Sequence, residues 1–232
     1  MSEVFSREDE PAVPALLRHF APLEVELGDF QVCLRPLGVA DRDRVRQGYA
    51  LLSEESRMNR FWEKPGEMSQ SRAESLTNTD SRNHVAWVVL PQEESAIPAY
   101  GAASFWRDSR DSSSAELAFT IGDPWQRKGF ASLLFSILWF DGWRTGLRSF
   151  HGVSRRRNLA MASWWESVGG EVSEHGRQYE LHLDLKEPQA FVDQIAFGIT
   201  AGSRQVEVAE WMQLWLEIAS GSADLGEGER DS

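Results

Sequence analysis

The spacing of apolar residues changes near residue 122, and this change is the feature that most constrains the fold. Over residues 116–121 apolar and polar residues alternate, which predicts a half-buried strand. After a turn that contains Gly122 and Pro124, the apolar residues from 131 to 140 recur at three- and four-residue steps, which predicts a buried helix. A strand that leads directly into a helix is typical of proteins in which helices cover a sheet.

Further elements are predicted on both sides of this unit. A helix is predicted over residues 41–52, and residues 66–80 are polar and would hold at most a short helix. A second C-terminal helix is predicted over residues 158–168, ended by Gly169 and Gly170. The remaining strands are predicted over residues 30–37, 84–90, 99–106, 149–154 and 179–185. This order predicts an α/β (α+β) fold, with a central mixed sheet flanked by helices.

The 232 residues suit one domain with extensions. Residues 1–27 contain three prolines and are expected to form a loosely structured N-terminal extension before a domain over residues 28–187. Residues 188–219 are expected to form a helical extension, and residues 220–232 an acidic, disordered tail. In the extension, Trp211 and Trp215 share one helical face that would either dock on the domain or form a homodimer contact.

Composition excludes several classes of protein. The 24 Lys and Arg against 36 Asp and Glu give a net charge of −12, which disfavours nucleic acid as a partner. Cys33 is the single cysteine, so we expect neither an internal disulfide nor a cysteine-based zinc site, and no metal. The first 17 residues contain no long apolar stretch, and residues 131–140 are too few to span a bilayer. We therefore expect a cytoplasmic protein that does not bind membranes.

The segment Gln126-Arg127-Lys128-Gly129-Phe130-Ala131 lies between the predicted strand and helix. A helix N-terminus presents unpaired N–H groups and a partial positive charge, so it can bind an anion such as a phosphate. Gly129 and Ala131 would leave room for the phosphate to approach the backbone. Residues 107–157 hold nine basic and five acidic residues, a local charge of +4 in an acidic chain. The alternative is a solvated helix start with incidental charges.

This segment resembles the Q/R-x-x-G-x-G/A signature of the GCN5-related N-acetyltransferase (GNAT) superfamily. Asn158 opens a helix that ends in SVGG, which resembles the family's N…G-F element, and LRPLGVADRDRV resembles its first strand and helix. LSEESRMNRFW and AELAFTIGD are similar to the acetyltransferase domain of bacterial protein-lysine acetyltransferases. The resemblance covers roughly residues 30–185.

The resemblance implies where acetyl-CoA would bind. In this family the cofactor lies in a V-shaped gap between two splayed parallel strands, which here would be residues 116–122 and 149–154. Asn158 would bond near the pantetheine or the acceptor. The backbone of the first strand would pair with the pantetheine at Phe119, Thr120 and Ile121. The pyrophosphate would lie on the amides of Gln126, Arg127, Lys128, Gly129, Phe130 and Ala131.

The resemblance also implies direct acetyl transfer to a primary amine, such as a protein lysine, a polyamine or another small amine. Glu116 matches the glutamate of the A-E-x-A pattern and would be the general base, although it could instead be an exposed strand-end residue. Trp165 stands where many members have a tyrosine that protonates the thiolate. Solvent could replace that acid. The departure also leaves open a non-catalytic acyl-CoA-binding regulatory module, or an interaction scaffold with a vestigial pocket.

Other residues carry two interpretations each. His151 would be an alternative base, or a histidine that packs or faces solvent. The three arginines 155–157 would contact the adenosine 3′-phosphate, or form a solvated loop. Trp106 and Trp125 would line an acceptor pocket, or belong to the core.

Overall fold

A computed structural model describes residues 22–27, 29–62, 66–92 and 98–186. Most of the predicted N-terminal extension, the C-terminal helical extension and the acidic tail lie outside these residues, so those three assignments stay predictions. The same holds for the helix with Trp211 and Trp215 and for the homodimer contact. Within the described ranges, no helix combines the length and the apolar character needed to cross a membrane.

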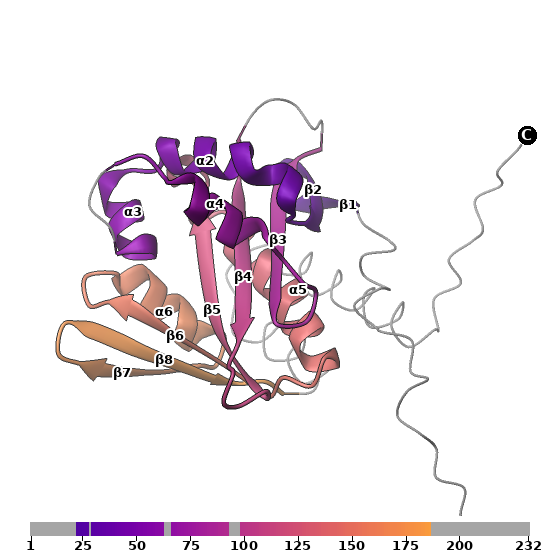
Figure 1. Cartoon of the computed structure of the whole chain (residues 1–232). Helices are drawn as coiled ribbons and strands as arrows, with labels where there is room; N and C mark the ends of the chain where they lie inside the picture. Colours follow the sequence, from indigo (N-terminus) through magenta and orange to yellow (C-terminus); the bar gives the residue numbers. More distant parts are fainter. Residues whose placement is uncertain (1–21, 28, 63–65, 93–97, 187–232) are drawn as a thin grey trace, which may run out of the picture.

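The described chain forms one eight-stranded sheet in the order β1-β2-β3-β4-β5-β6-β8-β7 (Figure 1). β5 and β6 are parallel, and the other neighbouring strands are antiparallel. This confirms the predicted mixed sheet. The strands are β1 (Leu23–Leu27), β2 (Phe30–Pro36), β3 (His84–Pro91), β4 (Gly101–Arg107), β5 (Ser114–Ile121), β6 (Ser149–Arg155), β7 (Glu171–His175) and β8 (Gln178–Asp184).

Two of these strands were not predicted. β1 falls in the segment expected to be a loosely structured extension, and that expectation was wrong for residues 23–27, which pair with β2 along their whole length. β7 is short and largely exposed, so it carries little apolar alternation. Both strands lie at an edge of the sheet. Their extended conformation depends on pairing with a neighbouring strand, which the local sequence does not reveal.

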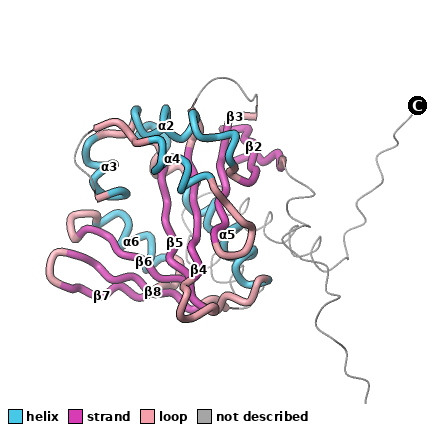
Figure 2. The backbone as a smooth tube through the Cα atoms, viewed as in Figure 1, coloured by secondary structure: helices cyan, strands magenta, loops and turns pink. Residues whose placement is uncertain are grey.

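Helices cover both faces of the sheet (Figure 2). Helix α5 packs on the face that carries the core residues Trp87, Phe105 and Leu117, whereas α2 packs on the opposite face against Ala86 and Val88. The division follows from the two-residue period of side chains along each strand. The helices are α2 (Arg42–Leu51), α3 (Glu54–Phe61), α4 (Gln70–Thr77), α5 (Phe130–Arg144) and α6 (Leu159–Ser167), with 3-10 turns η1 (Val39–Asp41) and η2 (Asp123–Trp125).

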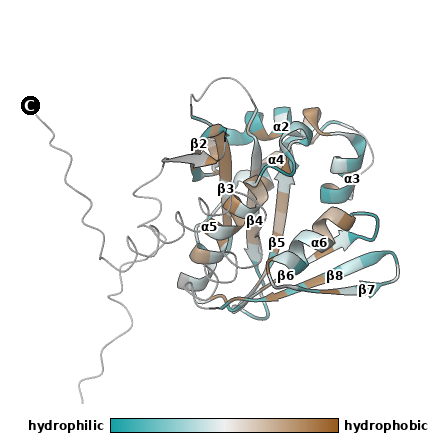
Figure 3. Ribbon diagram, turned by 180° about the vertical axis from the view of Figure 1, so that it is seen from behind, coloured by the Kyte–Doolittle hydropathy of each residue, from teal (hydrophilic) through white to brown (hydrophobic). Residues whose placement is uncertain are grey.

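The core lies between the sheet and α5. Helix α5 is apolar over most of its circumference, as expected for a helix that is buried on several sides. Figure 3 shows that the strands are largely hydrophobic, whereas α3 is largely hydrophilic. The buried Trp87 of β3 donates from Nε1 to Asp141 Oδ2 of α5 at 2.8 Å. This bond satisfies a buried indole N–H and a buried carboxylate together.

Candidate active site

Strands β5 and β6 separate along their length. They pair at Ser114–Ser149, Ala115–Phe150 and Glu116–His151, and the ladder ends there, although β5 stays paired with β4 up to Ile121. In Figures 1 and 2 the two strands run in clearly different directions beyond this point. The splayed parallel strands expected from the sequence are therefore present, and the divergence begins directly after Glu116.

The separation opens a cleft of about 630 Å³ bordered by β5, β6, α3, α6 and the start of α5. Ten of the eleven site residues predicted from the sequence line this cleft. They are Glu116, Phe119, Thr120, Ile121, Gln126, Arg127, Gly129, Phe130, Ala131 and Asn158. The fold thus brings together residues that lie up to 42 positions apart in the sequence.

The turn before α5 has the backbone of an anion site. Arg127 and Gly129 both have positive φ, 60° and 92°, and Gly129 is the N-cap of the 15-residue helix α5. Successive N–H groups in such a turn form a concave donor surface, and the helix dipole adds to it. An added Cβ on Gly129 would contact Leu27 at 3.4 Å, on strand β1. The left-handed φ by itself favours glycine here, and the space that this glycine would leave for a phosphate stays a prediction.

Two side chains of this turn, those of Gln126 and Lys128, contact other parts of the protein. Gln126 donates from Nε2 to Ser56 Oγ and to the Ile121 carbonyl, both at 3.2 Å. Lys128 is the predicted residue that is absent from the cleft lining, and its ammonium lies 4.9 Å from the centre of the Phe30 ring. These contacts hold the turn in place, so any role of Lys128 toward the cofactor would be through its backbone amide.

Helix α3 is fastened to the same turn through Asp123. The carboxylate accepts bonds from Ser53 N at 2.8 Å, from Ser53 Oγ at 2.7 Å and from Ser56 Oγ at 2.7 Å. Burial raises the pKa of Asp123, but these hydrogen bonds outweigh it and hold the pKa below its ordinary value. Helix α3 was not predicted, although Ser53 followed by two glutamates is a helix-start signal.

Glu116 lies in a row of chemically active side chains across the sheet. The strand registers align His84 with Trp106, Trp106 with Glu116, and Glu116 with His151. The rings of His84 and Trp106 stack at 3.5 Å, and His151 Nε2 lies 3.0 Å from Asp108 Oδ2. Because cross-strand neighbours share a face, the exposed Glu116 is flanked by an aromatic surface on one side and a histidine–carboxylate pair on the other.

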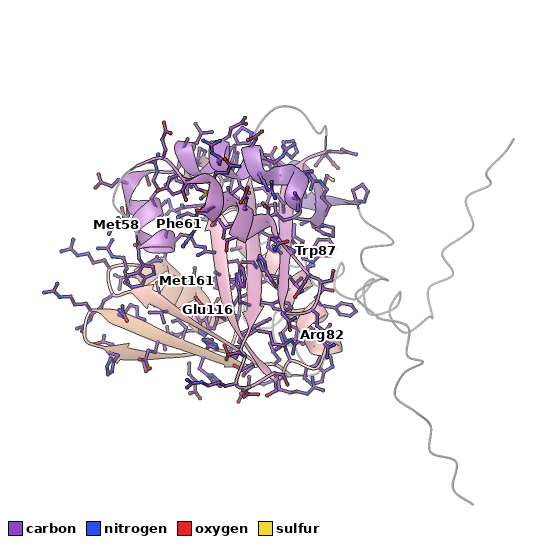
Figure 4. All side chains as sticks on the ribbon, viewed as in Figure 1. Met58, Phe61, Arg82, Trp87, Glu116 and Met161 are labelled. Atoms are coloured by element: carbon purple, nitrogen blue, oxygen red, sulfur yellow. The ribbon has the colours of Figure 1, made fainter. Side chains whose placement is uncertain are left out.

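Arg60 of α3 faces Glu116 across the cleft. Its Nε is enclosed and has no hydrogen-bond partner in the described part of the chain. Burial lowers the pKa of Arg60 to about 10, against the opposing charge of Glu116 and with a further contribution from Arg72. Figure 4 shows Glu116 on β5 together with Phe61 of α3 and Met161 of α6, which also line the cleft.

Trp165 and Gly170, which stands where the family's N…G-F element has a phenylalanine, are two departures from the family pattern, and they are structurally linked. Trp165 is buried, and its Nε1 donates to the His182 carbonyl at 3.0 Å. An added Cβ on Gly170 would lie 2.2 Å from the Trp165 ring, so the large indole requires glycine at this position. Asn158 accepts a bond from Met161 N at 3.3 Å and caps α6.

The remaining candidates divide between cleft and surface. Arg157 lines the cleft, whereas Arg156 pairs with Glu174 at 2.5 Å. Trp125 lines the cleft and packs on Tyr100, and Trp106 is 38% exposed, so neither is a pure core residue. No cluster of His, Cys, Asp and Glu that could hold a metal occurs among the residues that the structure describes.

The sequence of the chain is similar to those of a known family and of two named proteins. Residues 31–171, more than half of the chain, match the family model described as "Acetyltransferase (GNAT) domain". "Acetyltransferase Pat" of Mycolicibacterium smegmatis is 28% identical over 64% of this chain and 43% of its own length. "Acetyltransferase PA5475" of Pseudomonas aeruginosa is 30% identical over 56% of this chain and 69% of its own length. The chain therefore spans less than half of the mycobacterial relative.

Solved structures agree with the fold. The GNAT domain of S. lividans PAT superposes with a TM-score of 0.64 at 22% identity, over 70% of this chain and 96% of that one. Spermidine N-acetyltransferase from Vibrio cholerae, solved with CoA and spermine, superposes with a TM-score of 0.54 at 18% identity, over 66% of this chain and 95% of that one. Taken with the splayed strands and the turn at the start of α5, these matches establish that the chain belongs to the GNAT acetyltransferase family.

Proposed function

We propose that this protein is an acetyl-CoA-dependent N-acetyltransferase that transfers the acetyl group directly to a primary amine in a ternary complex. The observation that carries the proposal is the separation of β5 and β6 directly after Glu116, which opens a cleft toward the positive-φ turn at the start of α5. The cleft leaves backbone groups of residues 117–121 without a β6 partner. Such groups suit the amides of a pantetheine arm, because buried backbone donors and acceptors require partners.

The residues present fit coenzyme A. The turn over residues 126–131, with its two positive-φ residues and its helix N-terminus, supports binding of a diphosphate. Arg157 on the cleft wall would meet a further phosphate. Bound acetyl-CoA would supply the thioester whose acetyl group is transferred.

Glu116 is the proposed general base. A lysine-like amine has a pKa near ~10.4, so it must lose a proton before it can attack. Glu116 would take that proton, and a backbone N–H of the free β5 edge would donate to the oxyanion. Since Trp165 is buried and its N–H is engaged by His182, the leaving thiolate, with a pKa of about 8.5, would take its proton from solvent.

The acceptor is proposed as a class. The mycobacterial relative is named an acetyltransferase, and the Vibrio cholerae structure contains spermine beside CoA, so primary amines are the natural candidates. A protein lysine, a polyamine and another small amine all fit this class. The net charge of −12 would favour the approach of a cationic acceptor at low ionic strength.

The test is release of CoA from acetyl-CoA with a panel of primary amines, for the wild type and for Glu116→Gln. We expect the variant to lose about 10²–10⁴-fold in kcat while CoA affinity, measured by calorimetry, is kept. Glu166→Gln, an exposed change on α6 away from the cleft, is the matched control and should retain full turnover. Equal turnover by wild type and Glu116→Gln would exclude Glu116 as the base.

One observation favours a second function. The acid position is occupied by Trp165, whose indole is buried in the core, so the chain could bind acyl-CoA as a non-catalytic regulatory module. Tight CoA binding without turnover on any amine would support that function. Absence of CoA binding would contradict both.

A further inference from the structure

A second cavity lies beside the cleft, on the face of the sheet that carries Glu116. It has a volume of about 240 Å³, smaller than the ~300–1,000 Å³ of drug-sized ligand sites. Helices α2–α4 form its roof and strands β3–β5 its floor. The roof contributes large apolar side chains such as Tyr49, Leu52 and Phe61, and the floor contributes small ones, among them Ala86, Ala102 and Ala118. The short floor side chains are what leave the space open.

The cavity and the cleft share a wall. Arg60, Phe61, Ala118, Thr120 and Trp125 line both. Ala118 follows Glu116 by two residues on β5, so both side chains lie on one face of the strand, about 6.7 Å apart at a rise of ~3.3–3.4 Å per residue. A molecule whose reacting nitrogen lies at Glu116 can therefore place a side chain of a few carbons in the cavity.

Arg60 places a positive charge where the cavity meets the cleft. Its Nε is enclosed without a hydrogen-bond partner, and no ion pair joins Arg60 to another described residue. An enclosed donor without a partner is costly, and a guanidinium is best matched by a carboxylate, which can accept two parallel bonds. The other arginine of the cavity wall, Arg44, already lies 3.6 Å from Asp41.

We propose that the acceptor is a free apolar amino acid, with its carboxylate on Arg60, its side chain in the apolar cavity and its α-amine at Glu116. This rests on the proposed acetyltransferase function and names its substrate class. In the reaction Glu116 takes a proton from the amine, the nitrogen–carbonyl carbon bond forms and the carbon–sulfur bond breaks. The nitrogen then loses its second proton to solvent, and the products are an N-acetyl amino acid and CoA, whose thiolate takes a proton from solvent.

The test compares kcat/KM for leucine and leucinamide, which differ only in the carboxylate, in wild type and Arg60→Met. Because the two amines also differ in basicity, the readout is the change in their ratio between the two proteins. We expect Arg60→Met to lower the leucine-to-leucinamide ratio by at least about tenfold, since one charge-assisted contact is lost. Arg46→Met, the same change on the exposed side of α2, should leave the ratio unchanged.

A second variant tests the cavity without touching the charge. Ala102→Leu adds a bulky side chain to the cavity floor and should lower the kcat/KM ratio of leucine to glycine by about tenfold, while CoA affinity stays as in the wild type. If a thermal melt shows that Arg60→Met does not fold, Ala102→Leu and Arg60→Lys, which keeps a cation, are measured in its place.

Several results would overturn the inference. Turnover with lysine peptides but not with leucine would do so while leaving the acetyltransferase function intact, as would equal loss of leucine and leucinamide activity in Arg60→Met. If Arg60→Met instead changed the preference between succinyl-CoA and acetyl-CoA, Arg60 would bind the acyl group and not the acceptor. Failure to bind CoA, or no turnover on any amine, would defeat the acetyltransferase function and this inference together.

Discussion

At the scale of single residues, three positions are constrained by their backbone conformation or by close packing. Arg127 and Gly129 have left-handed backbone conformations in the turn before α5, and the buried Trp165 ring leaves no room for a side chain at Gly170. The second case explains why two departures from the family pattern occur together. The indole fills the space that a side chain at residue 170 would need, so a change at either position affects the other.

Gly170→Ala tests this coupling. The added methyl would lie 2.2 Å from the Trp165 ring, and we expect a loss of about 1–3 kcal/mol in the free energy of unfolding, as for other overpacked sites. Denaturant unfolding measures it. Gly48→Ala in α2 is the matched control, because nothing lies within 4 Å of its added Cβ and alanine favours a helix by about 1 kcal/mol. A neutral Gly170→Ala would show that Trp165 can move.

At the scale of elements, the cleft is built from parts that are tied to one another. Helix α3, which carries Arg60 and Phe61, is held to the β5–α5 turn by the three bonds that Asp123 accepts and by the bond from Gln126 to Ser56. The turn that would receive the diphosphate and the helix that borders the apolar cavity are therefore held together by hydrogen bonds. Loss of this tie should disturb both ends of the site.

Asp123→Asn weakens the tie with little change in shape. An amide cannot accept all three bonds, and each bond to a charged group contributes about 1.5–3 kcal/mol. We expect faster hydrogen exchange of the α3 amides and a weaker affinity for CoA. Asp184→Asn, on an exposed aspartate at the end of β8, should alter neither. Unchanged α3 protection in Asp123→Asn would show that packing alone holds the helix.

At the scale of the whole molecule, the charge of −12 is distributed unevenly, with a basic stretch over residues 107–157 that contributes β5, β6 and the start of α5 to the cleft. Several carboxylates are held ionised by the fold. Burial raises the pKa of Asp41, but hydrogen bonds from Arg35 and from the Gly38 amide lower it by a larger amount. The pKa of Asp41 therefore lies below its ordinary value. Burial also raises the pKa of Asp80, but hydrogen bonds from the amides of residues 82–84 outweigh it and hold the pKa well below its ordinary value.

These shifts predict how stability depends on pH. Asp41, Asp80 and Asp123 have folded-state pKa values below the ordinary 3.8, so the unfolded chain binds protons first and stability should fall steeply below about pH 4. Burial lowers the pKa of His84 below 6.5, so a shallower loss should begin near pH 6.5. Urea midpoints from pH 8 to 3 measure both. His84→Phe should remove the shallow part alone; a flat profile down to pH 4 in wild type would contradict the assignment of His84.

Local sequence patterns predict the fold and the backbone elements that border the candidate site. The period change at residue 122, the strand–turn–helix segment and the helix opened by Asn158 depend on local patterns, and the structure confirms their positions. The strands β1 and β7 were missed because their order depends on neighbours far along the chain. Glu116 was predicted from its match to a family pattern, and its role stays a prediction.

The surroundings of Glu116 depend on how separate elements pack together. Strand register aligned it with Trp106 and His151, the packing of α3 placed Arg60 opposite it, and small residues from three strands opened the apolar cavity. None of these has a local signature, because each joins residues tens of positions apart that meet only when the sheet and its helices assemble. A motif formed by contiguous backbone can be predicted from the sequence, whereas an acceptor pocket is formed by side chains from separate elements.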